Sequence, residues 1–143
     1  MLKAYRGFAY AIAVGVLLQA AFIAYGVFSI GDGGTLEEED NTGIGLHGLT
    51  GGLIIPLLTI ILLVLSFFTK TKNASKRAGM VFGAVLIQQF LAGFGQDVPF
   101  LGALHGLNAF VILGSSAYAA RLAAAAQTAT GTTTPTVSGS SAV

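Results

Sequence analysis

The chain has 143 residues, of which 54% are apolar and only 9% are charged, and its net charge is +1. Soluble domains usually contain about 25% charged residues, so this composition excludes an ordinary water-soluble domain and predicts a chain whose main partner is the lipid bilayer, not a nucleic acid. The absence of cysteine excludes disulfides, thiolate catalysis and thiolate ligation of a metal or haem.

Four long and nearly uncharged runs follow one another along the chain. A membrane-spanning helix needs about 20 apolar residues, within a range of about 17–25, and none of the runs alternates as a barrel strand does. We therefore predict an all-α, integral membrane four-helix bundle. Its expected spans are Phe8–Ile30, Gly43–Phe68, Gly79–Gln96 and Phe100–Ala120.

Charged residues separate onto opposite sides of these spans. The basic residues lie before the first span, between the second and third, and just after the fourth, whereas the acidic residues lie in the other two connections. The positive-inside rule makes the basic side cytoplasmic. We therefore expect a multi-pass protein of the plasma membrane of the cell with both termini in the cytoplasm.

The chain divides into a transmembrane domain, residues 1–121, and a tail, residues 122–143. The tail is rich in Ala, Thr and Ser, and we expect it to be polar and disordered. Two local features are expected in the second span: Asn41 or Thr42 caps its start, and Pro56 kinks it and frees a carbonyl one turn earlier.

An internal repeat relates the two halves of the bundle. Residues 17–26 (LLQAAFIAYG) align without a gap with residues 86–95 (LIQQFLAGFG), and an LHGL frame follows each copy, at 46–49 and 104–107. The chain therefore reads as two parallel-repeated helical hairpins. Each hairpin has a glutamine in the middle of its first helix and a histidine near the outer end of its second.

The repeated residues are Gln19 and Gln88, and His47 and His105. We expect the two glutamines, together with Gln89, to form hydrogen bonds across the bundle. The repeat places the two histidines at a similar depth, on helices that can face each other.

His47 and His105 are the only histidines of the chain. Ionisable groups within membrane segments usually face the bundle interior, and a neutral imidazole is a standard ligand of haem iron. We predict that the two imidazoles are the metal ligands of one haem b, bound from opposite faces. In the alternative interpretation, each imidazole is a polar group near the outer interface that is hydrogen-bonded to a neighbour.

Glycines surround both histidines. Gly48, Gly51 and Gly106 would leave room for a macrocycle beside each ligand and are predicted to be part of the cofactor site. The spacing of Gly48 with Gly52, and of Gly102 with Gly106, also predicts close packing of helices. The two interpretations are compatible.

A hydrogen-bonding residue, Thr50 or Asn108, stands three residues after each histidine and on the same helix face. We include both in the cofactor site, where they would orient an imidazole or contact a propionate; the alternative is a bond to a neighbouring helix. A zinc or copper site is less well supported, because it needs three or four ligands.

These features resemble the small bis-His haem b membrane proteins, and in particular one four-helix half of the heme A synthase family. The resemblance covers about residues 8–121 and implies that His47 and His105 are haem ligands. That family has an acidic residue shortly before a ligand histidine, whereas Ile44, Gly45 and Leu46 precede His47. The resemblance therefore does not extend to synthase activity. The chain is also similar to uncharacterised small four-helix membrane proteins of bacteria.

The sequence thus predicts a cytochrome b-like membrane protein that transfers electrons or senses redox state. It would act as an electron carrier rather than an enzyme, with redox membrane proteins or a quinone as partners, and it could form a homo-oligomer. The alternative function is that of a cofactor-free accessory or structural subunit of a larger membrane complex. A transporter is disfavoured because the interiors of the spans carry no carboxylate.

Overall fold

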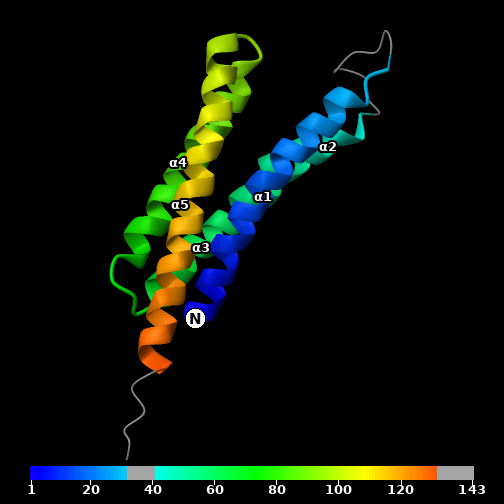
Figure 1. Cartoon of the computed structure of the whole chain (residues 1–143). Coiled ribbons are helices and arrows are strands. Elements are labelled where there is room, and N and C mark those ends of the chain that lie inside the picture. The colour runs from blue at the N-terminus through cyan, green and yellow to red at the C-terminus, as the bar shows by residue number, and fades with distance from the viewer. Residues whose placement is uncertain (32–40, 132–143) are drawn as a thin grey trace, which may run out of the picture.

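A computed structural model of the chain describes residues 1–31 and 41–131. These ranges contain helices and no strand. Four long helices follow one another in alternating directions (Figure 1). The elements are α1 (Leu2–Phe28), α2 (Thr42–Leu49), the π-helical segment η1 (Thr50–Ile54), α3 (Ile55–Phe68), α4 (Ala74–Gly95) and α5 (Pro99–Gly131).

The expectation of four long helices is confirmed. Helices α2, η1 and α3 are continuous and form the second long helix, Thr42–Phe68. By length and composition, each of the four is apolar and long enough to cross a membrane.

Helix α5 extends beyond the domain boundary expected at residue 121 and ends at Gly131. The first part of the expected tail is therefore helical. The reason is local, because residues 122–126 include four consecutive alanines and alanine has the highest intrinsic helix propensity. Residues 132–143, for which we also expected disorder, lie outside the described residues.

The hydrogen-bond pattern of the second long helix changes in its middle. At the end of η1, the backbone N–H of Ile55 donates to the carbonyl of Thr50, five residues back. Pro56 follows and has no N–H to donate. The disturbance expected from Pro56 therefore takes the form of a π-helical segment on its N-terminal side, a feature often found at functional sites.

The start of α2 is fastened to the end of α1. As expected, Asn41 caps α2, because its side-chain oxygen accepts a hydrogen bond from the N–H of Ile44 (3.1 Å). Its side-chain nitrogen donates to the carbonyl of Gly26 (2.9 Å). Glycine is needed at this crossing, since a Cβ on Gly43 would lie 2.3 Å from the backbone nitrogen of Gly26. The two backbones are therefore in direct contact.

The second hairpin has a similar glycine contact. A Cβ on Gly95 of α4 would lie 2.9 Å from the Cα of Gly102 on α5. Each hairpin is thus closed near its connection by two facing glycines. This close approach brings the second helix of each hairpin to hydrogen-bonding distance of the first.

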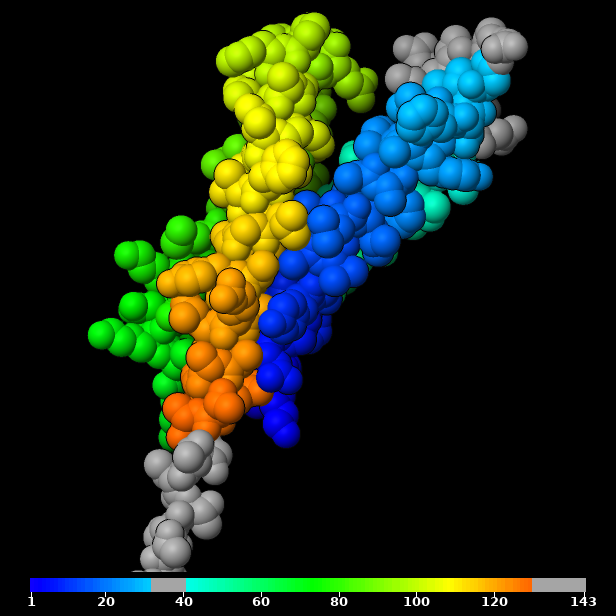
Figure 2. Space-filling model, in the orientation of Figure 1, coloured from blue at the N-terminus to red at the C-terminus, as the bar shows by residue number. Residues whose placement is uncertain are grey.

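The buried core lies toward the end of the molecule that contains the N-terminus and the α3–α4 connection. At the opposite end the helices diverge as two pairs, α1 with α2 and α4 with α5 (Figures 1 and 2). The core consists largely of small residues, which allow the helices to approach closely there. Its fully buried members include Ala9, Ile12, Leu62, Ala78, Val81, Ala120 and Ala123.

The outer surface is apolar along all four helices. Phe28, Phe67 and Phe68 are 89%, 70% and 65% exposed, and many leucines, isoleucines and valines are exposed with them. A contiguous surface of this kind is not stable in water and is typical of a face that meets lipid or another apolar partner.

The glycine contact between α1 and α2 can be tested by substitution. We expect Gly43→Ala to lower the free energy of unfolding by about 1–3 kcal/mol, because the new Cβ forces two backbones apart. Gly45→Ala is the matched control, since a Cβ on Gly45 would have nothing within 4 Å. Chemical unfolding in detergent, followed by circular dichroism, measures both. Equal stability of the two variants would contradict the packing.

Candidate cofactor site

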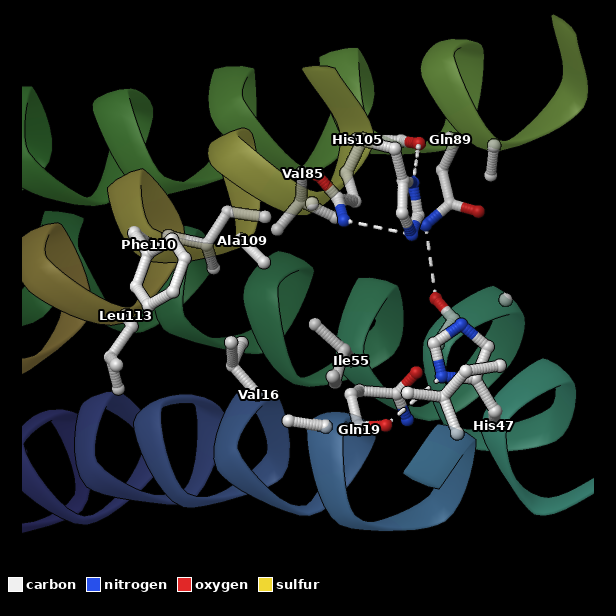
Figure 3. Close-up of a pocket in the computed structure, with 18 of the residues that line it drawn as sticks. Val16, Gln19, His47, Ile55, Val85, Gln89, His105, Ala109, Phe110 and Leu113 are labelled. Atoms are coloured by element: carbon white, nitrogen blue, oxygen red, sulfur yellow. Dashed lines mark hydrogen bonds between the residues drawn. The ribbon is translucent and has the colours of Figure 1, made fainter. Parts of the chain in front are cut away.

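The two histidines lie close together, toward the end of the molecule at which the helix pairs diverge. His47 is on α2 and His105 is on α5, and both side chains are half-buried. Their ring centroids are 6.2 Å apart and their planes are tilted by 59°. Figure 3 shows the rings on opposite sides of a cavity. The structure thus brings together the two residues that the sequence indicated as a pair.

Both imidazoles make the same hydrogen bond to the preceding helix of their hairpin. The Nδ1 atom of His47 is 3.2 Å from the carbonyl of Gln19, and that of His105 is 3.3 Å from the carbonyl of Gln88. A carbonyl oxygen only accepts hydrogen bonds, so Nδ1 is the donor in each ring. In a neutral imidazole the lone pair is then on Nε2, the arrangement that prepares a histidine to bind a metal.

The side chain of Gln88 completes a short chain of hydrogen bonds around His105. Its amide nitrogen lies 3.2 Å from Nε2 of His105 and donates to it. Its amide oxygen accepts a hydrogen bond from the side chain of Asn108 (2.7 Å). Asn108 therefore acts on the imidazole through Gln88, and it also donates to the carbonyl of Ala84 on α4 (2.8 Å).

The corresponding group around His47 is arranged differently. The side-chain amide of Gln19 is hydrogen-bonded to the hydroxyl of Thr50. The same hydroxyl donates to the carbonyl of Leu46 (2.5 Å). Thr50 and Asn108 thus both form a hydrogen bond to a neighbouring helix, which was the alternative role expected for them. The glutamine contacted by Thr50 does not bond to Nε2 of its histidine.

A third glutamine joins the two hairpins. The side-chain nitrogen of Gln89 on α4 donates to the carbonyl of Gly51 in η1 (3.0 Å). That carbonyl has lost its helical donor, since the N–H of Ile55 goes to Thr50 and Pro56 has none. The expectation that the glutamines bond across helices is confirmed for Gln19, Gln88 and Gln89.

A cavity of about 540 Å³ lies between the hairpins. The two histidines and Gln89 are at one end, and apolar side chains such as Val16, Phe110 and Leu113 form the other (Figure 3). The size and the mostly apolar wall, with a few polar groups gathered in one place, are typical of a site for a small molecule or cofactor.

Three of the glycines that line the cavity face open space. A Cβ added to Gly48, Gly52 or Gly106 would have no heavy atom within 4 Å. The expected close packing through these three glycines is therefore wrong; a side chain there would project into free volume. Gly51 differs, because its Cβ would lie 2.6 Å from the side-chain oxygen of Gln19. Gly102 is the other exception and contacts α4, as described above.

The distance between the two imidazoles limits the groups that they can hold together. An imidazole–metal bond is about 2.0–2.1 Å long, so two rings on one metal have centroids roughly 6 Å apart. The 6.2 Å separation of His47 and His105 fits this requirement. Within residues 1–31 and 41–131, no group of three or more His, Cys, Asp or Glu side chains could hold a metal ion. A haem, whose macrocycle supplies the remaining ligands, fits two histidines better than zinc does.

Two parts of the site were not identified as such from the sequence. The backbone carbonyls of Gln19 and Gln88 orient the imidazoles, and the Gln89–Gly51 bond links the hairpins at the level of the cavity. For the Gln89–Gly51 bond, the sequence does contain a signal. Pro56 stands five residues after Gly51, and it lacks the N–H that a π-helical pattern would direct to the Gly51 carbonyl.

The Gln89–Gly51 bond can be tested by a double-mutant cycle. We expect Gln89→Leu to lower the free energy of unfolding by about 1–2 kcal/mol, because the Gly51 carbonyl is left without a donor. In a Pro56→Ala background the loss should be smaller, since residue 56 then has an N–H to offer.

Gln96→Leu, at the exposed end of α4, is the control and should change stability by no more than about 0.5 kcal/mol. Chemical unfolding in detergent measures the free energy of unfolding of the wild type, the three variants of the cycle and the control. An undiminished effect of Gln89→Leu in the Pro56→Ala background would show that this carbonyl is not the group that Gln89 satisfies.

Comparison of the chain with protein-family models, with curated proteins and with solved structures found no match.

Proposed function

We propose that this chain is an integral membrane protein that binds one haem b between His47 and His105 and serves in electron transfer or redox sensing. The observation that carries the proposal is the pairing of these two imidazoles. Their centroids are 6.2 Å apart, and each Nδ1 donates to the carbonyl of the equivalent glutamine in its own hairpin. Two unrelated polar residues would not be expected to make the same Nδ1–carbonyl hydrogen bond and also to lie with their rings next to each other.

The surroundings of the histidines support a large planar cofactor rather than a bare ion. Gly48, Gly52 and Gly106 leave open volume beside the rings, and the cavity continues from them between apolar walls. Among the residues that the structure describes, none that lines the cavity is Lys or Arg. The carboxylates of a haem would therefore be solvated, not paired with basic side chains of the wall.

The histidines and glutamines of the site would have different roles in holding the haem. Bound haem supplies a one-electron iron couple. His47 and His105 would hold the iron through Nε2, while the carbonyls of Gln19 and Gln88 fix the ring tautomers and orientations. The amide of Gln88 would have to leave Nε2 of His105 before that atom could bind iron, because one lone pair cannot serve both.

The rest of the chain supports a membrane location. Four helices are long and apolar enough to span, and their outward faces expose large apolar side chains. We propose that the helices form two hairpins in parallel repeat, with both termini and all basic residues on the cytoplasmic side of the plasma membrane. The equivalent Nδ1 contacts and the glycine pair near each connection support the repeat.

The haem proposal predicts a coloured protein. Protein expressed with sufficient haem and purified in detergent should show the Soret band of a low-spin haem, and the His47→Ala, His105→Ala double variant should lack it. Visible absorption spectroscopy with haem quantification makes the measurement. A colourless, folded wild-type protein would reject the proposal, and a partner that co-purifies with it would favour an accessory subunit instead.

A pair of glycines on α5 offers a control for general damage. Gly106 and Gly114 both face open space, but only Gly106 lines the cavity. We expect Gly106→Leu to lower haem affinity at least about fivefold, because its side chain fills the volume that the macrocycle needs. Gly114→Leu should retain wild-type affinity, and equal losses in both would argue against this cavity.

The proposed topology predicts how single cysteines react in intact cells. The chain has no cysteine, so Lys72→Cys and Asp97→Cys each introduce one. Both positions are exposed and lie in different connections of the bundle. A membrane-impermeant maleimide should label Asp97→Cys in intact cells and Lys72→Cys only after permeabilisation. The reverse pattern would overturn the orientation.

A further inference from the structure

The two imidazoles are equivalent at Nδ1 but not at Nε2. The Nε2 atom of His105 accepts a hydrogen bond from the amide of Gln88 (3.2 Å). His47 makes its hydrogen bonds through Nδ1, and the amide of the equivalent Gln19 lies between Thr50 and Nδ1 of His47, away from Nε2. Among residues 1–31 and 41–131, the lone pair needed for ligation is thus already in use on His105, whereas no hydrogen bond engages it on His47.

This difference arises from one substitution between the repeated frames. Thr50 and Asn108 occupy the same position, three residues after each histidine. The Asn108 amide donates to the oxygen of Gln88 (2.7 Å) and to the carbonyl of Ala84 (2.8 Å), and so aims the Gln88 nitrogen at His105. The hydroxyl of Thr50 donates to the carbonyl of Leu46 and holds the Gln19 amide to itself. Both ends of the Gln88 amide are therefore held in place.

We infer that His47 is the permanent ligand and His105 the exchangeable one, so that a small neutral diatomic molecule can take the position of His105. The inference rests on the haem proposal above. A His105 ring released from the iron would find a hydrogen-bond donor, the Gln88 amide, already positioned by Asn108, and this would lower the free-energy cost of its release. Neutral imidazole is replaced by a neutral ligand, and neither a proton nor an electron moves in the exchange.

The space beside His105 suits such a ligand. A Cβ on Gly106, the next residue along α5, would have no atom within 4 Å, and the cavity around it is mostly apolar. A small uncharged molecule loses little on entering an apolar cavity, whereas an ion would lose its hydration. Exchange at His105 makes the site a sensor of diatomic molecules rather than a simple electron carrier.

Carbon monoxide is the probe, added to the reduced holoprotein in detergent. We expect the wild type to bind it with a shift of the Soret band. In Gln88→Leu the affinity should fall about two- to tenfold, because His105 loses its competing donor and holds the iron more tightly. Gln19→Leu removes the equivalent amide on the His47 side and should change the affinity less. Gly114→Leu, outside the cavity, should match the wild type.

A second pair of variants covers a misfolded Gln88→Leu. Asn108→Leu releases the Gln88 amide and should lower carbon monoxide affinity in the same direction, by a smaller factor. Thr50→Val, at the equivalent position, should have less effect. In the haem-free protein, the nitrogen NMR resonance of His105 Nε2 should move toward that of an imidazole nitrogen without a donor when Gln88 is replaced.

The outcomes separate the inference from the function on which it rests. A wild type that binds haem but not carbon monoxide, or equal affinities in Gln88→Leu, Gln19→Leu and wild type, would overturn the inference and leave the haem proposal intact. A wild type without haem would reject both. An unmoved His105 resonance in haem-free Gln88→Leu would also count against the inference, because Gln88 would then not be the donor.

Discussion

The carbonyl of Gly51 has no donor in its own helix, and its hydrogen bond comes from the other hairpin. Ile55 donates to Thr50, and Pro56 cannot donate at all. In an apolar environment an unpaired backbone carbonyl costs several kcal/mol, so a partner must come from within the protein. Gln89 supplies it from the other hairpin. This bond links the two hairpins at the level of the cavity.

The same rule explains why the site is built from amides and hydroxyls. Gln19, Gln88, Asn108 and Thr50 all find partners on a neighbouring helix. No charge is needed to fix the imidazoles, since helix carbonyls accept from Nδ1 of both. Burying such neutral, hydrogen-bonded groups in a low-dielectric interior costs little free energy, whereas an unpaired carboxylate or ammonium would be strongly unfavourable there.

The sequence was sufficient for the parts of the fold that depend on local composition. The four apolar runs became four helices, Asn41 caps the second, and the paired LHGL frames brought His47 next to His105. It was not sufficient for distances between helices. The spacing of Gly48 and Gly52 suits close packing, yet both border open space, whereas direct backbone contact occurs at Gly26 and Gly43. Spacing along one helix does not say how far away the next helix is at that level.

The helices are packed together at one end and diverge as two pairs at the other. The two pairs therefore form two arms that meet at the core, which is their vertex. His47 on α2 and His105 near the start of α5 lie out along the two arms, some distance from the tightly packed alanines of the core. An angular change at that vertex is magnified along the arms. The distance between the two imidazoles is therefore governed by residues that never touch them.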